Sequence, residues 1–206
     1  MIVDDFIWVI LAAGNSTRLG QPKQLLKLGS QSLIQHQVQT LLATGLPVCV
    51  VSGAVDLNDD ITPHANLNIL HNPDWHKGMG TSVILAQKTH NQKSIGWVLV
   101  DQYAITTEQA FEFYQYWKHQ PTQVLVSQYQ HQDINSWGVP VIIPHKIMAT
   151  VNAPERERGL KPWLLANQHR VSIHYFIWPH AEVDLDTKSQ WQTIQHQESW
   201  HVNTQH

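Results

Sequence analysis

The stretch FIWVILAAGNSTRLGQPKQLLKLG, residues 6–29, decides how this chain is expected to fold. Residues 6–11 are apolar and rich in β-formers, which predicts one buried strand. The small residues 12–14 follow and would let a ligand lie against the backbone, and beyond them come Arg18 and Lys23, the latter expected to be exposed. Backbone N–H groups in such a loop bind anions, and cations neutralise the remaining charge. The stretch predicts a polyphosphate-binding loop, with an ordinary surface turn as the alternative.

Two well-known phosphate-binding motifs do not fit this loop. Gly14 and Gly20 are separated by five residues, whereas the P-loop has four and continues with Gly-Lys-Ser/Thr. The G-x-G-x-x-G fingerprint of Rossmann dinucleotide-binding proteins is also absent from the stretch. A phosphate site here must therefore be of another kind.

The composition predicts one globular domain over residues 1–206, with a tail after about residue 195 that is poorly ordered. Hydrophobic residues make up 42% of the 206 residues, charged residues make up 14%, and the net charge is −3. No basic block is present, so neither nucleic acid nor an anionic membrane is an expected partner. No apolar run approaches the roughly 18 residues of a membrane span. We therefore expect a soluble, cytoplasmic protein.

Cysteine and histidine usage argues against a disulfide and against a zinc site. The single cysteine, Cys49, lies in the apolar run 48–51, which favours a buried structural thiol over a nucleophile. The fourteen histidines are scattered and form no H-x-x-x-H or H-E-x-x-H pair. They are expected to be surface or packed residues.

Strands and helices are expected to alternate along the chain. We expect strands at 6–11, 48–53, 67–70, 96–101, 124–129 and 171–178, and helices at 32–44, 83–89, 106–119 and 159–168. Segment 137–144 is apolar, but its prolines are expected to limit pairing in the middle of a sheet. Such alternation predicts a three-layer α/β fold with a mostly parallel sheet.

Three aspartates are candidates for a metal site. Asp101 follows an apolar strand, where it would be either the N-cap of the next helix or a metal ligand. In parallel sheets ligands bind beyond the carboxyl ends of the strands, so Asp101 and the Gly14 loop are expected to meet there. Asp184 and Asp186 would face the same way in an extended segment, and the alternative for them is a solvated strand end. Mg²⁺ prefers carboxylate, water and phosphate oxygens, so it is the expected cofactor.

Residues 11–26, LAAGNSTRLGQPKQLL, resemble the signature of the MobA-like nucleotidyltransferase family. The segments NPDWHKGMGTS, VLVDQY, WGVPVIIP, RERGLKPWLL and VDLDT resemble further elements of one branch, the molybdenum cofactor cytidylyltransferases. Tyr103 and Lys188 stand where that pattern usually has proline, and Glu157 and Arg158 replace its usual polar pair. The resemblance implies the Rossmann-like nucleotidyltransferase fold over nearly the whole chain.

The resemblance also implies roles for individual residues. Arg18 and Lys23 would bind the triphosphate, and Asp101 with Asp184 or Asp186 would hold Mg²⁺ against it. A phosphate oxygen of the acceptor would attack the α-phosphorus and expel pyrophosphate. The base and ribose would be held by Leu11, Ala12, Ala13, Gly14, Gly80, Thr81 and Ser82.

The implied substrates are CTP and a molybdopterin-type acceptor, with a molybdoenzyme or its chaperone as a protein partner. Ala13 favours this branch over the guanylyltransferases, which usually carry glycine there. The methylerythritol-phosphate cytidylyltransferases are a related alternative, but residues 101–107, DQYAITT, lack their H-D-A-A-R-P motif. Transfer to another phosphorylated small molecule, and a carrier that binds nucleotide or cofactor without turnover, remain open as alternatives.

Overall fold

The computed structural model describes residues 6–16, 19–130, 135–151, 159–178, 185 and 190–192. Its main sheet has seven strands in the order β5-β4-β1-β6-β8-β7-β9. These strands are β1 (Phe6–Leu11), β4 (Val48–Ser52), β5 (Leu67–His71), β6 (Ser94–Leu99), β7 (Val124–Gln130), β8 (Asn135–Ile143) and β9 (Ile173–Ile177). A second sheet pairs β2 (Lys27–Leu28) with β3 (Gln31–Ser32).

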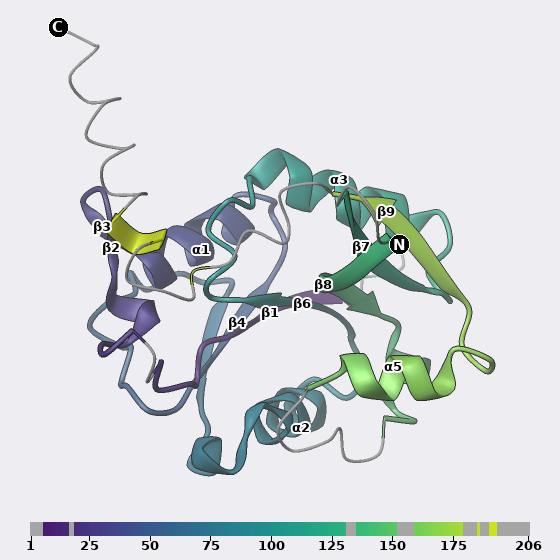
Figure 1. The fold of residues 1–206 in the computed structure, drawn as a ribbon, viewed down its shortest axis with the longest axis horizontal. Coiled ribbons are helices and arrows are strands. Elements are labelled where there is room, and N and C mark those ends of the chain that lie inside the picture. The colour runs from purple at the N-terminus through teal and green to yellow at the C-terminus, as the bar shows by residue number, and fades with distance from the viewer. Residues whose placement is uncertain are drawn as a thin grey trace, which may run out of the picture.

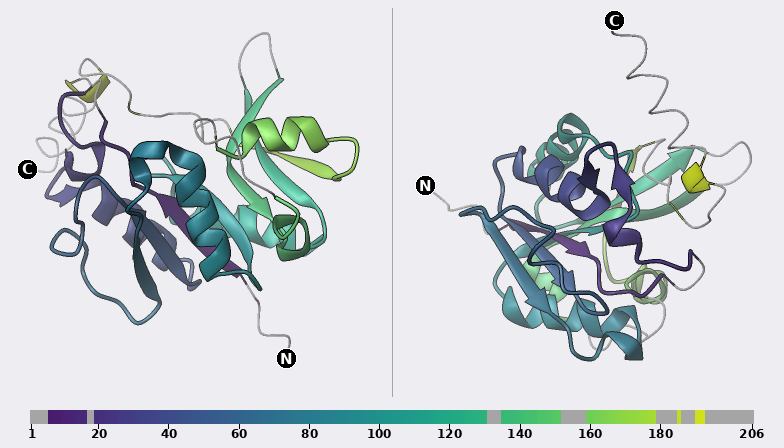
Figure 2. Two further views of the ribbon diagram at one scale, coloured as in Figure 1. Left: turned by 90° about the horizontal axis from the view of Figure 1, so that it is seen from below. Right: turned by 90° about the vertical axis from the view of Figure 1, so that its left-hand side faces the viewer.

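Helices cover both faces of the main sheet (Figure 1). Figure 1 shows α1 and α3 on one face and α2 and α5 on the other, and the two further views in Figure 2 show the same layers. The helices are α1 (Leu33–Leu42), α2 (Met79–Thr89), α3 (Thr107–Lys118), α4 (His145–Met148) and α5 (Lys161–Asn167), with 3-10 turns η1 (Lys23–Leu25) and η2 (Trp75–Lys77). The predicted three-layer α/β architecture is confirmed.

The sheet is mostly parallel, and β8 is its exception. Strands β5, β4, β1 and β6 run parallel, as do β7 and β9, whereas β8 is antiparallel to both β6 and β7. The segment pairs centrally between β6 and β7, but its pairing is limited at the proline, as expected, because the ladder with β6 covers only residues 141–143. The register shifts between Val126 and Ser127, which pair with Val141 and Gly138, so Pro140 lies within the irregularity. A bulge is one of the few places where a sheet tolerates proline.

The side chains of β1 alternate between two apolar cores. Trp8 and Ile10 pack with α1 and α3, whereas Val9 and Leu11 pack with α2 and α5. Every residue of β1 is buried, as is typical of a parallel strand covered on both faces. Burial of both faces explains why residues 6–11 read as a continuous apolar run rather than an alternating one.

Two residues in the strands next to β1 show how tightly this centre is packed. A Cβ at Gly96 of β6 would lie 2.4 Å from the Trp8 ring, so only glycine lets this indole cross the strand. Cys49 of β4 is buried, and desolvation by this burial raises the pKa of its thiol to about 12. The thiol is therefore protonated at neutral pH, which agrees with the predicted structural role.

The helix boundaries differ from the predictions by a few residues, most at α2. This helix begins at Met79, four residues before the expected start, with Gly78 at φ 109° as its N-cap. Helix α3 begins with a capping box formed by Thr106 and Gln109. None of the helices in the described part of the chain has the length and apolar character that a membrane crossing requires. The expected disordered tail lies outside the described residues.

Candidate active site

The loops that follow β1 and β6 meet at the carboxyl edge of the sheet. These strands are direct parallel neighbours, with Leu11 paired to Leu99. Lys23 Nζ lies 2.8 Å from Asp101 Oδ2, and the two side chains are only 13% and 14% exposed. The predicted meeting of the two loops is thus observed. The expectation that Lys23 would be exposed was wrong, because Lys23 begins η1 and its ammonium is held against the sheet.

A buried glutamine holds the loop after β1 in shape. Gln24 Nε2 donates to the carbonyl oxygens of Ala12 at 2.5 Å and Gly14 at 2.7 Å, and the residue is 1% exposed. The Lys23 N–H donates to Ser16 Oγ at 3.1 Å, and Ser16 has the left-handed φ of 50°. One glutamine and one serine thereby fix the loop around Lys23.

The loop that carries Asp101 is fixed by a second set of amide contacts. Gln102 accepts from the Leu99 N–H at 3.0 Å and donates to the Val139 carbonyl at 2.8 Å. Gln37 on α1 donates to the Gln102 carbonyl at 2.6 Å. Asp101 is not the N-cap of the next helix, since Thr106 caps α3. Its Oδ1 is buried and has no hydrogen-bond partner among the described residues, which leaves this oxygen available to a ligand.

A cavity of about 380 Å³ lies beside the loop after β1. Its walls come from the end of β1, the loop, η2 and the N-terminus of α2. The lining residues are Leu11, Ala13, Gly14, Asn15, Ser16, Trp75, His76, Gly78, Met79 and Ser82. The free N–H groups at a helix N-terminus favour anions. The cavity therefore combines small backbone-exposing residues with an anion-favouring helix end.

A family model for the MobA-like NTP transferase domain matches residues 8–171. The chain belongs to this family. Its members are expected to combine a strand, a small-residue loop and a nearby aspartate, and the described site has these parts in contact.

Curated relatives match only part of this MobA-like chain. The bifunctional IPC transferase and DIPP synthase of Rubrobacter xylanophilus is 32% identical over 87 residues, which is 38% of this chain and 20% of that protein. The molybdenum cofactor cytidylyltransferase of Escherichia coli is 31% identical over 77 residues, which is 36% of this chain and 40% of that protein. The matched stretches thus span well under two thirds of either relative.

Solved structures share the fold over nearly the whole chain. A nucleotidyl transferase from Methanothermobacter has a TM-score of 0.74 at 17% identity and covers 93% of this chain and 96% of its own. The 4-diphosphocytidyl-2C-methyl-D-erythritol synthase of Anaerococcus prevotii has a TM-score of 0.73 at 9% identity, covering 94% and 96%. Rv0371c of Mycobacterium tuberculosis, solved with manganese, has a TM-score of 0.67 at 17% identity, covering 92% and 97%.

The predicted nucleotide-binding residues of this MobA-like domain divide into two groups. Leu11, Ala13, Gly14 and Ser82 line the cavity. Ala12, Lys23, Gly80 and Thr81 are not among the lining residues. The Ala12 carbonyl accepts from Gln24, Gly80 is buried in α2, and Thr81 Oγ1 donates to the Gly78 carbonyl at 2.8 Å.

Of the three predicted metal ligands, only Asp101 lies in the described part of the chain. Arg18, Asp184 and Asp186 lie outside the described residues, so their predicted roles stay predictions. Across the described ranges no group of three His, Cys, Asp or Glu side chains gathers in one place. Leu185, which stands between the two aspartates in the sequence, is buried in a cluster with Leu19, Leu26 and Tyr103. Tyr103, found where the family pattern has proline, is thus accommodated by apolar packing.

The sequence did not identify several residues that shape the site. Gln24 lies within the motif at residues 11–26. Asn72, which follows β5, donates from Nδ2 to Thr81 Oγ1 and Ser82 Oγ, both at 2.9 Å, and so ties the end of β5 to the start of α2. Trp75 and Met79 contribute walls of the cavity. A signal was present for Asn72 and Trp75, because both belong to the quoted segment 72–82. For Gln24 the local sequence holds no signal of burial.

Proposed function

We propose that this protein is a Mg²⁺-dependent cytidylyltransferase that moves CMP from CTP onto a phosphorylated acceptor and releases pyrophosphate. The observation that carries the proposal is the contact between Lys23 and Asp101 beside a backbone-lined cavity. A cation for phosphate and a carboxylate for metal are both needed at the reacting phosphorus, and here they lie 2.8 Å apart. Membership of the MobA-like family supports the reaction class.

The proposed reaction needs positioning more than acid–base chemistry. An oxygen of the acceptor phosphate forms a bond to the α-phosphorus of CTP. The bond from that phosphorus to its bridging oxygen breaks, and pyrophosphate leaves with the electron pair. The attacking phosphate is already an anion, so no general base is required. Lys23, with Arg18, would stabilise the charge that builds up on the leaving group, which is the main way in which such sites act.

Asp101 has the character of a ligand for Mg²⁺. Within the described part of the chain its Oδ1 is buried without a hydrogen-bond partner, and an unsatisfied buried carboxylate oxygen is costly unless a cation takes it up. When bound, Mg²⁺ neutralises charge on the phosphate oxygens. Asp184 or Asp186 would be the second carboxylate, and the burial of Leu185 near Tyr103 supports this assignment. The related Rv0371c fold was solved with manganese.

We propose CTP as the nucleotide, and either a molybdopterin-type molecule or another phosphorylated small molecule as the acceptor. Ala13 lines the cavity and matches the cytidylyltransferase branch, and a partial relative is a molybdenum cofactor cytidylyltransferase. With that acceptor, a molybdoenzyme or its chaperone would receive the product. Transfer to another phosphorylated small molecule would use the same nucleotide site.

The nucleotide assignment is tested by ligand-induced stabilisation. With Mg²⁺ present, CTP at about 100 times its Kd is expected to stabilise the protein by about 2.7 kcal/mol and to raise its melting temperature. ATP and GTP are expected to have smaller effects. Release of pyrophosphate, coupled to an acceptor screen, tests turnover. Binding of CTP with no pyrophosphate release from any acceptor would favour the carrier alternative, and no stabilisation by any nucleotide would contradict both.

Gln24 is expected to affect nucleotide binding although it does not line the cavity. Gln24→Glu keeps the shape but removes the amide that donates to Ala12 and Gly14. Since each buried carbonyl left without a donor costs about 1–3 kcal/mol, we expect a lower free energy of unfolding and a KM for CTP raised at least several-fold. Urea unfolding and steady-state kinetics measure both. The exposed Gln92→Glu is the matched control, and an unchanged KM in Gln24→Glu would contradict the positioning role.

A further inference from the structure

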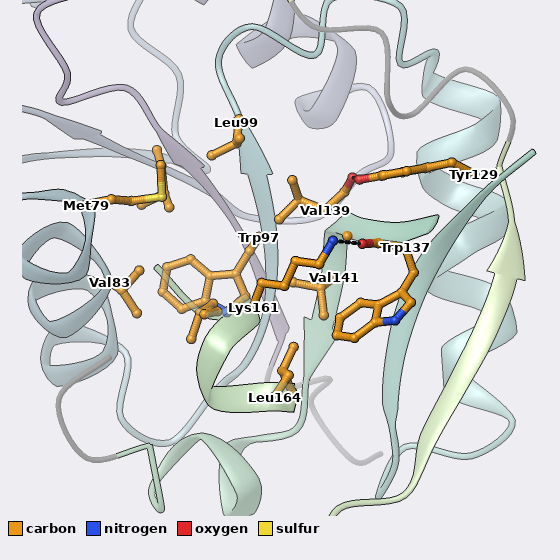
Figure 3. Close-up of a pocket in the computed structure, with 13 residues that line it drawn as sticks. Met79, Val83, Trp97, Leu99, Tyr129, Trp137, Val139, Val141, Lys161 and Leu164 are labelled. Carbon is orange, nitrogen blue, oxygen red and sulfur yellow. Dashed lines mark hydrogen bonds between the residues drawn. The ribbon is translucent and has the colours of Figure 1, made fainter. Parts of the chain in front are cut away.

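A second cavity of about 250 Å³ adjoins the nucleotide cavity (Figure 3). Leu11 and Met79 line both cavities, so the two are adjacent. The volume lies just below the range of about 300–1,000 Å³ that suits drug-sized ligands, so a compact group would fill it. The remaining lining residues are Val83, Trp97, Leu99, Tyr129, Trp137, Gly138, Val139, Val141, Leu160, Lys161 and Leu164.

Two backbone carbonyls in the β8 wall of this cavity are already engaged. The Val139 carbonyl accepts from Gln102 Nε2 at 2.8 Å and from the Tyr129 hydroxyl at 2.5 Å, which occupies both of its lone pairs. The Trp137 carbonyl accepts from Lys161 Nζ at 2.6 Å. A ligand body with many hydrogen-bonding groups would leave them unpaired against such a wall, and each would cost about 1–3 kcal/mol. The wall therefore selects for an apolar body.

Among the described residues that line the cavity, Lys161 is the one with a positive charge. Figure 3 shows its side chain running from α5 across the cavity to the Trp137 carbonyl. The ammonium also lies 5.2 Å from the centre of the Trp137 ring. An ammonium has three donors, and one of them is used by the Trp137 carbonyl. Two donors remain for an anion in the cavity.

The ammonium of Lys161 sits on the side of the cavity nearest the Asp101 loop. Lys161 bonds the carbonyl of Trp137, and Gln102 bonds the carbonyl of Val139. These two β8 residues are two positions apart, which is about 7 Å along a strand. Gln102 is the residue after Asp101. An anion on Lys161 would therefore point toward the place where transfer is proposed.

We propose that the second cavity is the acceptor site and that the acceptor is a phosphomonoester with a compact apolar body. This inference rests on the proposed function and names the substrate class for it. The body packs between Val83, Trp97 and Val141, and the phosphate is bound by Lys161 at the end that faces Asp101. One phosphate oxygen then attacks the α-phosphorus as described above, so no further reactant is needed. A pterin body, with its many ring donors and acceptors, matches these walls less well.

Isothermal titration with simple phosphomonoesters tests this class, with and without CTP and Mg²⁺. Benzyl phosphate is expected to bind, while glycerol 3-phosphate, with a polar body, and benzyl alcohol, without the anion, bind at least about tenfold more weakly. Equal binding of benzyl and glycerol phosphates would overturn the apolar class. The apolar class would also be overturned if the protein bound a phosphorylated pterin tightly and did not bind benzyl phosphate.

Three variants connect this binding to the cavity itself. Lys161→Met removes the charge at similar length and is expected to weaken benzyl phosphate about 10–100-fold, as for a lost charge-assisted hydrogen bond. Val139→Thr adds a hydroxyl to the wall at nearly the same shape and is expected to weaken binding several-fold. Lys146→Met, at an exposed position of α4, is the control. If benzyl phosphate bound Lys161→Met and Val139→Thr as it binds the native protein, the acceptor-site proposal would be wrong. If CTP failed to stabilise the native protein, the proposed function would be wrong instead.

Discussion

Lys23→Met is expected to lower kcat/KM for cytidylyl transfer by about 10²–10³-fold, the usual cost of removing one donor that stabilises transition-state charge. The ammonium is held in place before substrate binds, by Asp101 on one side and by the fixed loop on the other. Its positive charge is therefore preorganised for the triphosphate. Pyrophosphate release at saturating and subsaturating CTP separates the effects on kcat and KM. Lys88→Met, an exposed substitution on α2, is the control.

Lys23→Met is also expected to lower the free energy of unfolding, whereas the same substitution at a solvent-exposed lysine would not. Without Lys23, the Asp101 carboxylate loses the partner of Oδ2, and no described residue bonds its Oδ1. A largely buried acceptor left in this way costs about 1–3 kcal/mol. We expect urea unfolding to show a loss of this size and Mg²⁺ to restore part of it. Full stability together with normal turnover in Lys23→Met would contradict the role of the pair.

The strand and loop at residues 6–16 could be predicted because local signals determine them. A continuous apolar run marks a strand buried on both faces, and small residues after it mark a loop that admits a ligand close to the backbone. The meeting of Lys23 and Asp101, distant in sequence, followed from a rule of topology. Loops at the carboxyl ends of adjacent parallel strands share one edge of the sheet, and β1 and β6 are such neighbours.

The features that sequence reasoning missed depend on tertiary packing. Pro140 predicts limited central pairing, but no local pattern indicates the register shift opposite Ser127 that absorbs the proline. Gln24 resembles any polar loop residue, and only the folded chain places its amide between two carbonyls. The early start of α2 depends on Gly78 at φ 109°, whereas the apolar pattern begins later at Val83.

Acceptor recognition could not be predicted from the sequence for a related reason. The second cavity takes its walls from α2, β6, β8 and α5, which are separated along the chain and meet only through the sheet order. Trp137 and Lys161 belong to quoted motifs, but the stacking of the ammonium over the indole and its bond to the carbonyl are visible only in the fold. The nucleotide half of the site is therefore encoded locally and the acceptor half is not.

Asp101→Asn is expected to reduce transfer by about 10²–10⁴-fold, because a catalytic metal contributes several kcal/mol and each tenfold in rate corresponds to about 1.36 kcal/mol. Asparagine has the same shape and still offers one oxygen to Lys23, so the fold is expected to persist. The asparagine amide is neutral, so the negative charge is lost whichever position its oxygen takes. What the variant loses is the anionic ligand for a divalent cation.

Metal binding separates this role from a structural one. In the native protein, Mn²⁺ with CTP is expected to raise the melting temperature above that with CTP alone, and titration of Mn²⁺ by electron paramagnetic resonance gives its affinity. Asp101→Asn is expected to weaken that affinity at least tenfold, while Asp59→Asn, an exposed substitution, leaves it unchanged. If Asp101→Asn bound Mn²⁺ normally and turned over at a near-normal rate, Asp101 would not be the metal ligand. We expect weakened Mn²⁺ binding instead, because the Asp101 carboxylate lies at the edge of the sheet and its buried Oδ1 has no partner among the described residues.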